Sequence, residues 1–238
     1  MGNNDLKTWN AGALDYLEVA SEDNDTYKKY VDTPQFISLL GDVKGKRVLD
    51  IGCGDGALCS VLQEVGAIVT GLDGSEQMVS VAQKQHPSCN FIVSDLMSDT
   101  FSLDDQFDIV TSKMMLMNIR SVKKLTFNMC KILVANGLFA VDIVHPSYPL
   151  ISRSVKDRSR YDELDYHKEK LGSIEFGGKK FAYYYRPLEI YINQIQNSGF
   201  QLIKISEPHP SQDLVDKYPE LKSKQKLPVS IHMLFKKL

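Results

Sequence analysis

The sequence has few cysteines, a single tryptophan and no excess charge of either sign. Its four cysteines among 238 residues match no zinc-binding spacing, so we expect reduced thiols. The formal net charge is −2, and no global field favours nucleic acid or an anionic membrane. Neither a secretory signal nor an apolar run near the roughly 20 residues of a membrane helix is found. These absences predict a cytoplasmic protein that binds neither nucleic acid nor membrane.

Short apolar segments alternate with segments of helical periodicity over the first 145 residues. Strands are expected at 46–52, 67–73, 89–95, 107–113 and 138–145, and helices at 56–66, 75–86 and 121–137. This alternation is typical of a parallel sheet with helices on both faces. Ligands of such sheets bind beyond the carboxyl ends of the strands.

The last third of the chain completes the sheet. A helix is predicted at 187–199, a strand at 200–208 and a terminal strand at 229–238. No helix long enough for a crossover separates the last two strands, so the last strand should be antiparallel. We predict an α/β fold with a doubly wound, seven-stranded sheet.

Two segments are expected to cover this sheet. Residues 1–41 are predicted to form an N-terminal helical cap. A polar loop is predicted at 209–228, between the last two strands. Residues 146–186 form a polar, tyrosine-rich insertion, with two short strands that meet at Gly177-Gly178. We predict that residues 1–238 form one domain.

The segment VLDIGCGDG, residues 48–56, places a glycine-rich turn after the first predicted strand. With Ala57 it satisfies the dinucleotide pattern G-x-G-x-x-G/A. Asp73 follows about 20 residues later, where an acid binds ribose hydroxyls. These features indicate an adenosine-type cofactor, either a nicotinamide dinucleotide or S-adenosylmethionine.

Acidic residues at the edge of the turn favour the second cofactor. Asp50 and Asp55 would repel a diphosphate, whereas S-adenosylmethionine has no phosphate and carries an ammonium and a sulfonium. A dinucleotide enzyme would also need a second glycine-rich turn, which residues 107–115 do not supply. S-adenosyl-L-methionine is therefore the expected cofactor.

The chain resembles the class I S-adenosylmethionine-dependent methyltransferases, most specifically in VLDIGCGDG. GLDGSEQMVSVAQ, VSDL and FDIVTSKMMLMNI are similar to the second, third and fourth motifs of that family. The segment YYRPLEIYINQIQNSGFQLIKISEP is similar to the closing segment of bacterial small-molecule methyltransferases. The resemblance implies a Rossmann-like fold and methyl transfer to an O, N or C atom of a small metabolite by in-line displacement.

The resemblance also implies a set of cofactor-binding residues. Asp73 would bind the ribose, Asp95 the adenine amino group, and Lys113 would lie near the methionine moiety. The full set is Asp50, Gly52, Cys53, Gly54, Gly56, Asp73, Gly74, Ser75, Met78, Ser94, Asp95, Leu96, Lys113 and Met114. The segment LFAVDIV lacks the paired acids of metal-dependent catechol enzymes, so no metal requirement is expected.

His145 is the candidate general base for methyl transfer. It follows the fifth predicted strand at the ligand-bearing edge, and an imidazole suits proton transfer near neutral pH. The alternative is a histidine that caps the backbone before Pro146. A base is optional, because positioning alone can supply much of the rate.

Candidate substrate-binding residues come from the cap and the insertion. Tyr16 and Tyr30 would close over the site, or pack the cap onto the sheet. Arg186 would bind an acidic substrate group, or form an ion pair with Glu189. The full set is Tyr16, Tyr30, His145, Tyr148, Tyr185 and Arg186.

Two other functions stay open at this point. One is an NAD-dependent oxidoreductase, and the other is a non-catalytic module that binds S-adenosylmethionine and acts through a partner. The intact glycine turn and the tyrosine-rich insertion favour an enzyme with a small-molecule acceptor. We expect it to be a monomer or a homodimer.

Overall fold

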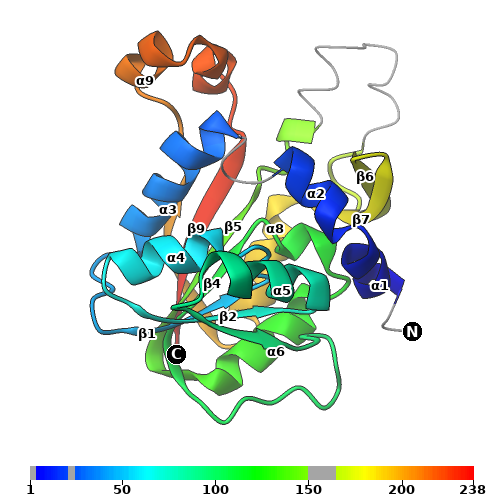
Figure 1. Ribbon diagram of the computed structural model, residues 1–238, viewed down its shortest axis with the longest axis vertical. Helices are drawn as coiled ribbons and strands as arrows, with labels where there is room; N and C mark the ends of the chain where they lie inside the picture. The colour runs from blue at the N-terminus through cyan, green and yellow to red at the C-terminus, as the bar shows by residue number, and fades with distance from the viewer. Residues whose placement is uncertain (1–3, 21–24, 150–164) are drawn as a thin grey trace.

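The computed structural model describes residues 4–20, 25–149 and 165–238. A seven-stranded sheet lies between two layers of helices, and a separate two-stranded ribbon lies at one side (Figure 1). The strands of the sheet are β1 (Arg47–Ile51), β2 (Ile68–Asp73), β3 (Asn90–Val93), β4 (Phe107–Lys113), β5 (Leu133–Val144), β8 (Phe200–Ser206) and β9 (Ser230–Lys237). Within the described ranges, no helix is long and apolar enough to cross a membrane.

The strand order is β3-β2-β1-β4-β5-β9-β8. The first five strands pair in parallel, whereas β9 is antiparallel to both β5 and β8. The predicted seven-stranded sheet with an antiparallel last strand is confirmed. The order reverses between β1 and β4, and the crevice at the carboxyl ends of those two strands is where ligands of such sheets bind.

Alternate residues of the central strands face two separate apolar cores. Val48 and Ile109 belong to the core under α3, α4 and α5, whereas Leu49 and Val110 belong to the core under α6 and α8. The bounds are α3 (Thr33–Leu40), α4 (Ala57–Glu64), α5 (Glu76–Gln85), α6 (Val122–Ile132) and α8 (Leu188–Gln196). Because both faces are covered, polar residues with a functional role gather at the strand ends.

The helix α6 ends earlier than the sequence predicts. It stops at Ile132, and β5 begins at Leu133, whereas the prediction extended the helix to Gly137. Leu133 pairs with Phe107 of β4, and Asn136 adopts a φ of 61°. Pairing with the neighbouring strand therefore overrides the helical pattern of this segment.

The N-terminal cap is helical, as predicted, and packs against the ribbon. It contains α1 (Asn4–Ala11), α2 (Ala13–Ala20) and the π-helix η2 (Lys28–Asp32). The ribbon pairs β6 (Lys170–Phe176) with β7 (Lys179–Tyr185), and the predicted turn at Gly177-Gly178 joins the two strands. α1 contacts β7 and α2 contacts β6, so cap and ribbon form one wall beside the sheet (Figure 1). Residues 150–164 of the predicted insertion lie outside the described residues.

The segment between β8 and β9 is more regular than the predicted polar loop. It contains α9 (Gln212–Lys217), whose N-cap is Ser211, and the 3-10 helix η5 (Pro219–Gln225). Val215 and Leu221 pack against Tyr27 and Val31 of the cap. These buried apolar contacts explain why the segment is ordered.

Candidate cofactor and active site

A cavity of about 530 Å³ opens at the carboxyl ends of β1, β2 and β4. It brings together most of the residues that the sequence predicts for the cofactor, together with residues of α1. The predicted residues in its lining are Tyr16, Gly52, Gly54, Asp73, Gly74, Ser75, Met78, Ser94, Asp95, Leu96, Lys113 and Met114. The lining residues without a predicted role are Asp5, Leu6, Trp9, Met97, Asp99, Met115, Asn118, Ile119, Arg120, Ser121 and Lys124.

The glycine turn after β1 forms part of the cavity wall. Gly52 and Gly54 have φ values of 67° and 55°, which side-chain-bearing residues disfavour. A Cβ on Gly52 would lie 2.4 Å from Cγ of Met115. A Cβ on Gly54 would instead meet no protein atom within 4 Å. Because Gly54 lines the cavity, this open space is available to a ligand.

Asp73, at the end of β2, joins the two loops that border the cavity. Its Oδ2 accepts a hydrogen bond from the Gly54 N–H at 3.0 Å, and its Oδ1 accepts one from the Ser75 N–H at 2.8 Å. Burial raises the pKa of the Asp73 carboxyl, and these backbone donors partly offset that effect. Each oxygen keeps a second lone pair, so the carboxylate can still accept from ligand hydroxyls.

Helix α1 lies directly against the loop after β2. A Cβ on Gly74 would lie 2.4 Å from Cδ1 of Leu6. Asn10 Oδ1 accepts from the Ser75 hydroxyl at 3.0 Å and from the Gln77 N–H at 3.1 Å. The cap therefore helps to shape the cavity. Sequence reasoning missed Leu6 and its neighbours because no local pattern specifies which loop this helix covers.

Two buried polar atoms of the cavity lining have no hydrogen-bond partner among the described residues. They are Nε1 of Trp9 and Oδ1 of Asn118. The Trp9 ring contacts the rings of Phe181 and Tyr16, at centroid distances of 4.4 and 5.2 Å. The Asn118 amide nitrogen donates to the Met114 carbonyl at 3.2 Å. Both atoms are buried beside the cavity, so a small side-chain movement would bring one unsatisfied donor and one unsatisfied acceptor to a ligand.

A smaller hollow beside the turn contains Asp50 and Cys53. Asp50 accepts hydrogen bonds from the Thr111 hydroxyl at 2.8 Å and from the Cys59 thiol at 3.6 Å. Burial raises the pKa of Asp50 to about 7, although these two donors lower it in part. The acid lies beneath the glycine turn, and its attraction for a cofactor ammonium stays a prediction.

Replacing Asp50 by Asn should change how stability depends on pH. The folded-state pKa of Asp50 is about 7 and its unfolded value is 3.8, so the wild-type protein loses stability as pH rises through that window. The variant lacks this loss. We therefore expect the stability of the variant minus that of wild type, measured as free energy of unfolding, to increase by a few kcal/mol between about pH 4 and pH 7. Urea denaturation at several pH values measures it, and parallel pH profiles would contradict the prediction.

Gly56 and Tyr30 do not line the cavity, although the sequence predicts both as site residues. Gly56 precedes α4 with a φ of 82°, and a Cβ there would lie 2.7 Å from the Phe91 ring. Tyr30 stacks on Tyr218 with ring centroids 4.7 Å apart. Gly56 therefore provides the backbone conformation that begins α4 and leaves room for the Phe91 ring. Tyr30 joins the cap to Tyr218, the residue just before η5.

Tyr148 and Tyr185 also lie outside the described lining. The Tyr148 hydroxyl accepts from Lys224 Nζ at 2.9 Å, near the segment that follows α9. The Tyr185 ring lies 4.6 Å from the Tyr183 ring within the ribbon. Both tyrosine side chains make contacts within the protein. Sequence periodicity alone could not distinguish such an internal contact from contact with a substrate.

His145 lies just beyond β5, as predicted, but outside the described cavity lining. Its Nε2 is 3.2 Å from Glu207 Oε1, and its Nδ1 is 2.7 Å from the Ser147 hydroxyl. Burial lowers the pKa of His145, and Glu207 partly counters that effect. An imidazole with a lowered pKa can accept a proton at neutral pH. Its role as a base stays a prediction.

Arg186 is buried and bound within the protein, contrary to its predicted contact with substrate. Its guanidinium donates to the carbonyls of Leu116, Ile119 and Arg120 at 3.2, 2.8 and 2.8 Å. Its Nε donates to Glu169 Oε1 at 2.6 Å, so the ion-pair partner is Glu169 rather than Glu189. Arg186 supports the segment after β4, which forms part of the cavity wall.

Known proteins share both this sequence pattern and this fold. The family described as "Methyltransferase domain" matches residues 49–141, the span from β1 to β5 that carries the glycine turn and Asp73. A Listeria monocytogenes protein assigned as an S-adenosylmethionine-dependent methyltransferase superposes with a TM-score of 0.72 and 25% identity, over 86% of this chain and 96% of that one. The chain is a class I S-adenosylmethionine-dependent methyltransferase.

Two curated relatives are methyltransferases of quinone pathways. The chain is 27% identical over 207 residues to the ubiquinone biosynthesis O-methyltransferase of Coxiella burnetii, covering 84% of this chain and 80% of the relative. It is 30% identical over 145 residues to the demethylmenaquinone methyltransferase of Renibacterium salmoninarum, covering 55% and 61%. The similarities to named methyltransferases show that the chain is an enzyme.

The cavity of this methyltransferase fits its cofactor, S-adenosylmethionine. The space beside Gly54 leaves room for a ligand near the backbone, and the Asp73 carboxylate can accept from ribose hydroxyls. Asp95 stands in the same lining beside Leu96. No phosphate-binding cation is required there, in agreement with the acids that surround the turn.

Proposed function

We propose that this methyltransferase transfers a methyl group to an O, N or C atom of a small, flat metabolite that carries a hydroxyl or amino group. The observation that carries the proposal is the unpaired indole N–H of Trp9 together with the unpaired amide oxygen of Asn118. A ring hydroxyl or amine can accept from the first and donate to the second. Aromatic and methionine side chains, such as Tyr16 and Met115, supply an apolar wall.

The similarity to a ubiquinone biosynthesis O-methyltransferase and to a demethylmenaquinone methyltransferase supports an acceptor of this kind, because quinones contain a flat ring. The cap supports it as well. Trp9 of α1 and Tyr16 of α2 line the cavity, and both rings contact the buried ring of Phe181 in the ribbon. A small molecule fits behind such a wall more readily than a folded macromolecule.

The catalytic contribution of the chain is alignment and the exclusion of water. The cofactor supplies a methyl group that is already activated on a sulfonium. The protein holds the acceptor in line with it, with Trp9 and Asn118 orienting the reacting group. The cap limits the access of water to the cavity.

Transfer of an isotopically labelled methyl group tests the proposal. We expect label in hydroxylated or aminated ring compounds and none in RNA, DNA or protein. Trp9→Phe keeps an aromatic ring but removes the N–H, so it should raise KM for the acceptor severalfold and leave the Kd for S-adenosylmethionine unchanged. Label found only in a macromolecule would overturn the proposal.

His145→Ala tests the predicted base. We expect lower turnover with unchanged cofactor binding, because the imidazole is predicted to take the acceptor's proton rather than hold the cofactor. Initial rates and calorimetric titration with S-adenosylmethionine measure the two quantities. Exposed His209 offers a matched control, His209→Ala. Turnover equal to that control would exclude His145 as the base.

A further inference from the structure

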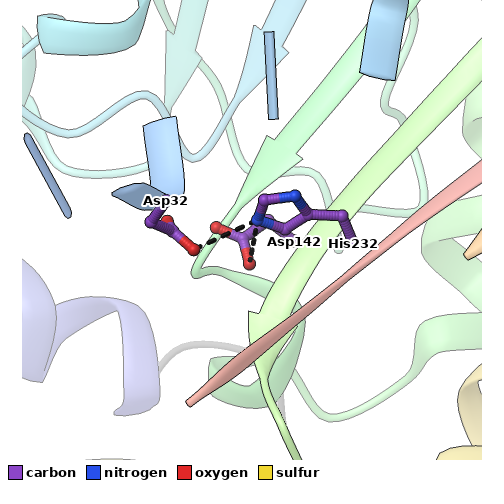
Figure 2. Close-up of side chains that lie close together, drawn as sticks. All are labelled: Asp32, Asp142 and His232. Carbon is purple, nitrogen blue, oxygen red and sulfur yellow. Dashed lines mark hydrogen bonds and ion pairs between the residues drawn. The ribbon is translucent and has the colours of Figure 1, made fainter. Parts of the chain in front are cut away.

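A second group of buried charged residues lies apart from the cavity lining. Asp32 ends η2, Asp142 lies in β5 and His232 lies in β9, and all three residues have no solvent exposure. Figure 2 shows the two carboxylates and the imidazole turned toward one another. Three elements that are distant in sequence therefore converge on one point, where the cap meets the sheet.

The spacing of these side chains matches that of ligands around one metal ion. His232 Nε2 lies 3.1 Å from Asp32 Oδ1 and 3.6 Å from Asp142 Oδ1. One candidate ligand atom from each residue lies within 4.8 Å of the others. Atoms that share an ion at bond lengths of about 2.0–2.2 Å lie roughly 3–3.5 Å apart. A small cation could therefore contact all three residues after slight adjustment.

Unsatisfied polar atoms at this point indicate a ligand. Within the described residues, neither side-chain oxygen of Asp142 accepts a hydrogen bond. His232 Nε2 lies 3.6 Å from Asp142 Oδ1, and the ammonium of Lys113 lies 3.9 Å from Asp142 Oδ2. A fully buried carboxyl group at this position either shares a proton with the Asp32 carboxylate or meets a cation, and a bound divalent cation would take the place of that proton.

Lys113 supplies a single positive charge for two carboxylates. Its Nζ lies 3.0 Å from Asp32 Oδ2, so its charge is used mainly by Asp32. The Lys113 side chain also lines the cofactor cavity, so its ammonium could turn toward the cavity and away from Asp32. A divalent cation would supply the charge for both carboxylates.

We propose that Asp32, Asp142 and His232 form a binding site for a divalent transition-metal cation, with which the Lys113 ammonium competes. Two carboxylates and one imidazole are ligands that suit Mn²⁺, Fe²⁺ or Zn²⁺. The ion joins the cap to β5 and β9 and stabilises that junction. It stands behind the cavity wall, so methyl transfer does not use it.

Electron paramagnetic resonance with Mn²⁺ tests the site in the full chain, because this ion prefers oxygen and nitrogen to the four cysteine thiols. We expect one bound Mn²⁺ with nitrogen coupling from His232, and a rise in Tm on adding it. Lys113→Met removes the competing ammonium and should tighten binding roughly tenfold. Asp142→Asn should weaken it at least roughly tenfold, since even changes beyond the direct ligands have effects of that size.

His232→Gln and the exposed His209→Gln form the decisive pair. The nitrogen coupling should disappear in the first variant and persist in the second. The proposal is overturned if wild type binds no Mn²⁺ at millimolar concentration, or if His232→Gln keeps the coupling. Should His232→Gln fail to fold, Lys113→Met decides the question, because unchanged or weaker binding there excludes competition at this site.

Discussion

Gly54→Ala should reduce the affinity for S-adenosylmethionine about 10- to 100-fold while the protein stays folded. The added methyl group meets no protein atom within 4 Å, so it creates no clash inside the protein. It enters the space that the cofactor needs, and overpacking of that kind costs about 1–3 kcal/mol. The residue must also keep a φ of 55°, and this strain of about 1–2 kcal/mol lowers the stability of the folded protein rather than its affinity for the cofactor. Calorimetric titration measures the loss.

Gly45→Ala is the matched control for this prediction. Gly45 has a φ of 71° and equally open surroundings, but it lies before β1 and away from the cavity. Both variants should therefore lose similar stability in urea denaturation, and only Gly54→Ala should lose cofactor binding. Equal affinities in the two variants would show that Gly54 does not border the cofactor.

Arg186→Met should lower the free energy of unfolding by about 3–5 kcal/mol. The substitution removes the donors to three backbone carbonyls and leaves Glu169 without its buried partner. It also removes the guanidinium that lies 4.7 Å above the Tyr184 ring. Ile119 and Arg120, whose carbonyls lose donors, line the cavity, so cofactor affinity should fall as well.

Urea denaturation measures this loss of stability, with Lys180→Met as the matched control for Arg186→Met. Lys180 is an exposed cation on the same ribbon, and its substitution should change stability by less than about 0.5 kcal/mol. If Arg186→Met instead changed stability little and weakened only the binding of the acceptor, the predicted contact between Arg186 and substrate would be supported. The result thus separates a structural arginine from a binding one.

Most of the cofactor side of the site could be predicted from the sequence because short segments determine it. The turn at Gly52 and Gly54 needs positive φ, which glycine provides locally. Asp73 and Ser75 directly follow a buried strand, and that placement brings them to the carboxyl edge. In each case the chemistry and the position are encoded within a few neighbouring residues.

The acceptor side could not be predicted in the same way. Trp9 reaches the cavity because α1 packs on the loop after β2, and Tyr30 misses it because η2 packs against Tyr218. Residue type did not separate these two aromatic side chains. Their difference arises from contacts between segments far apart in the sequence.

The order of strands and helices along the chain, the antiparallel last strand and the cofactor class could all be predicted from local sequence features. Each follows from hydrophobic periodicity, glycine conformation and the charge around one turn. The internal role of Arg186 and the meeting of Asp32, Asp142 and His232 became apparent only in the folded protein. Such outcomes depend on long-range packing, since a buried charge takes its role from the partners that folding brings within reach.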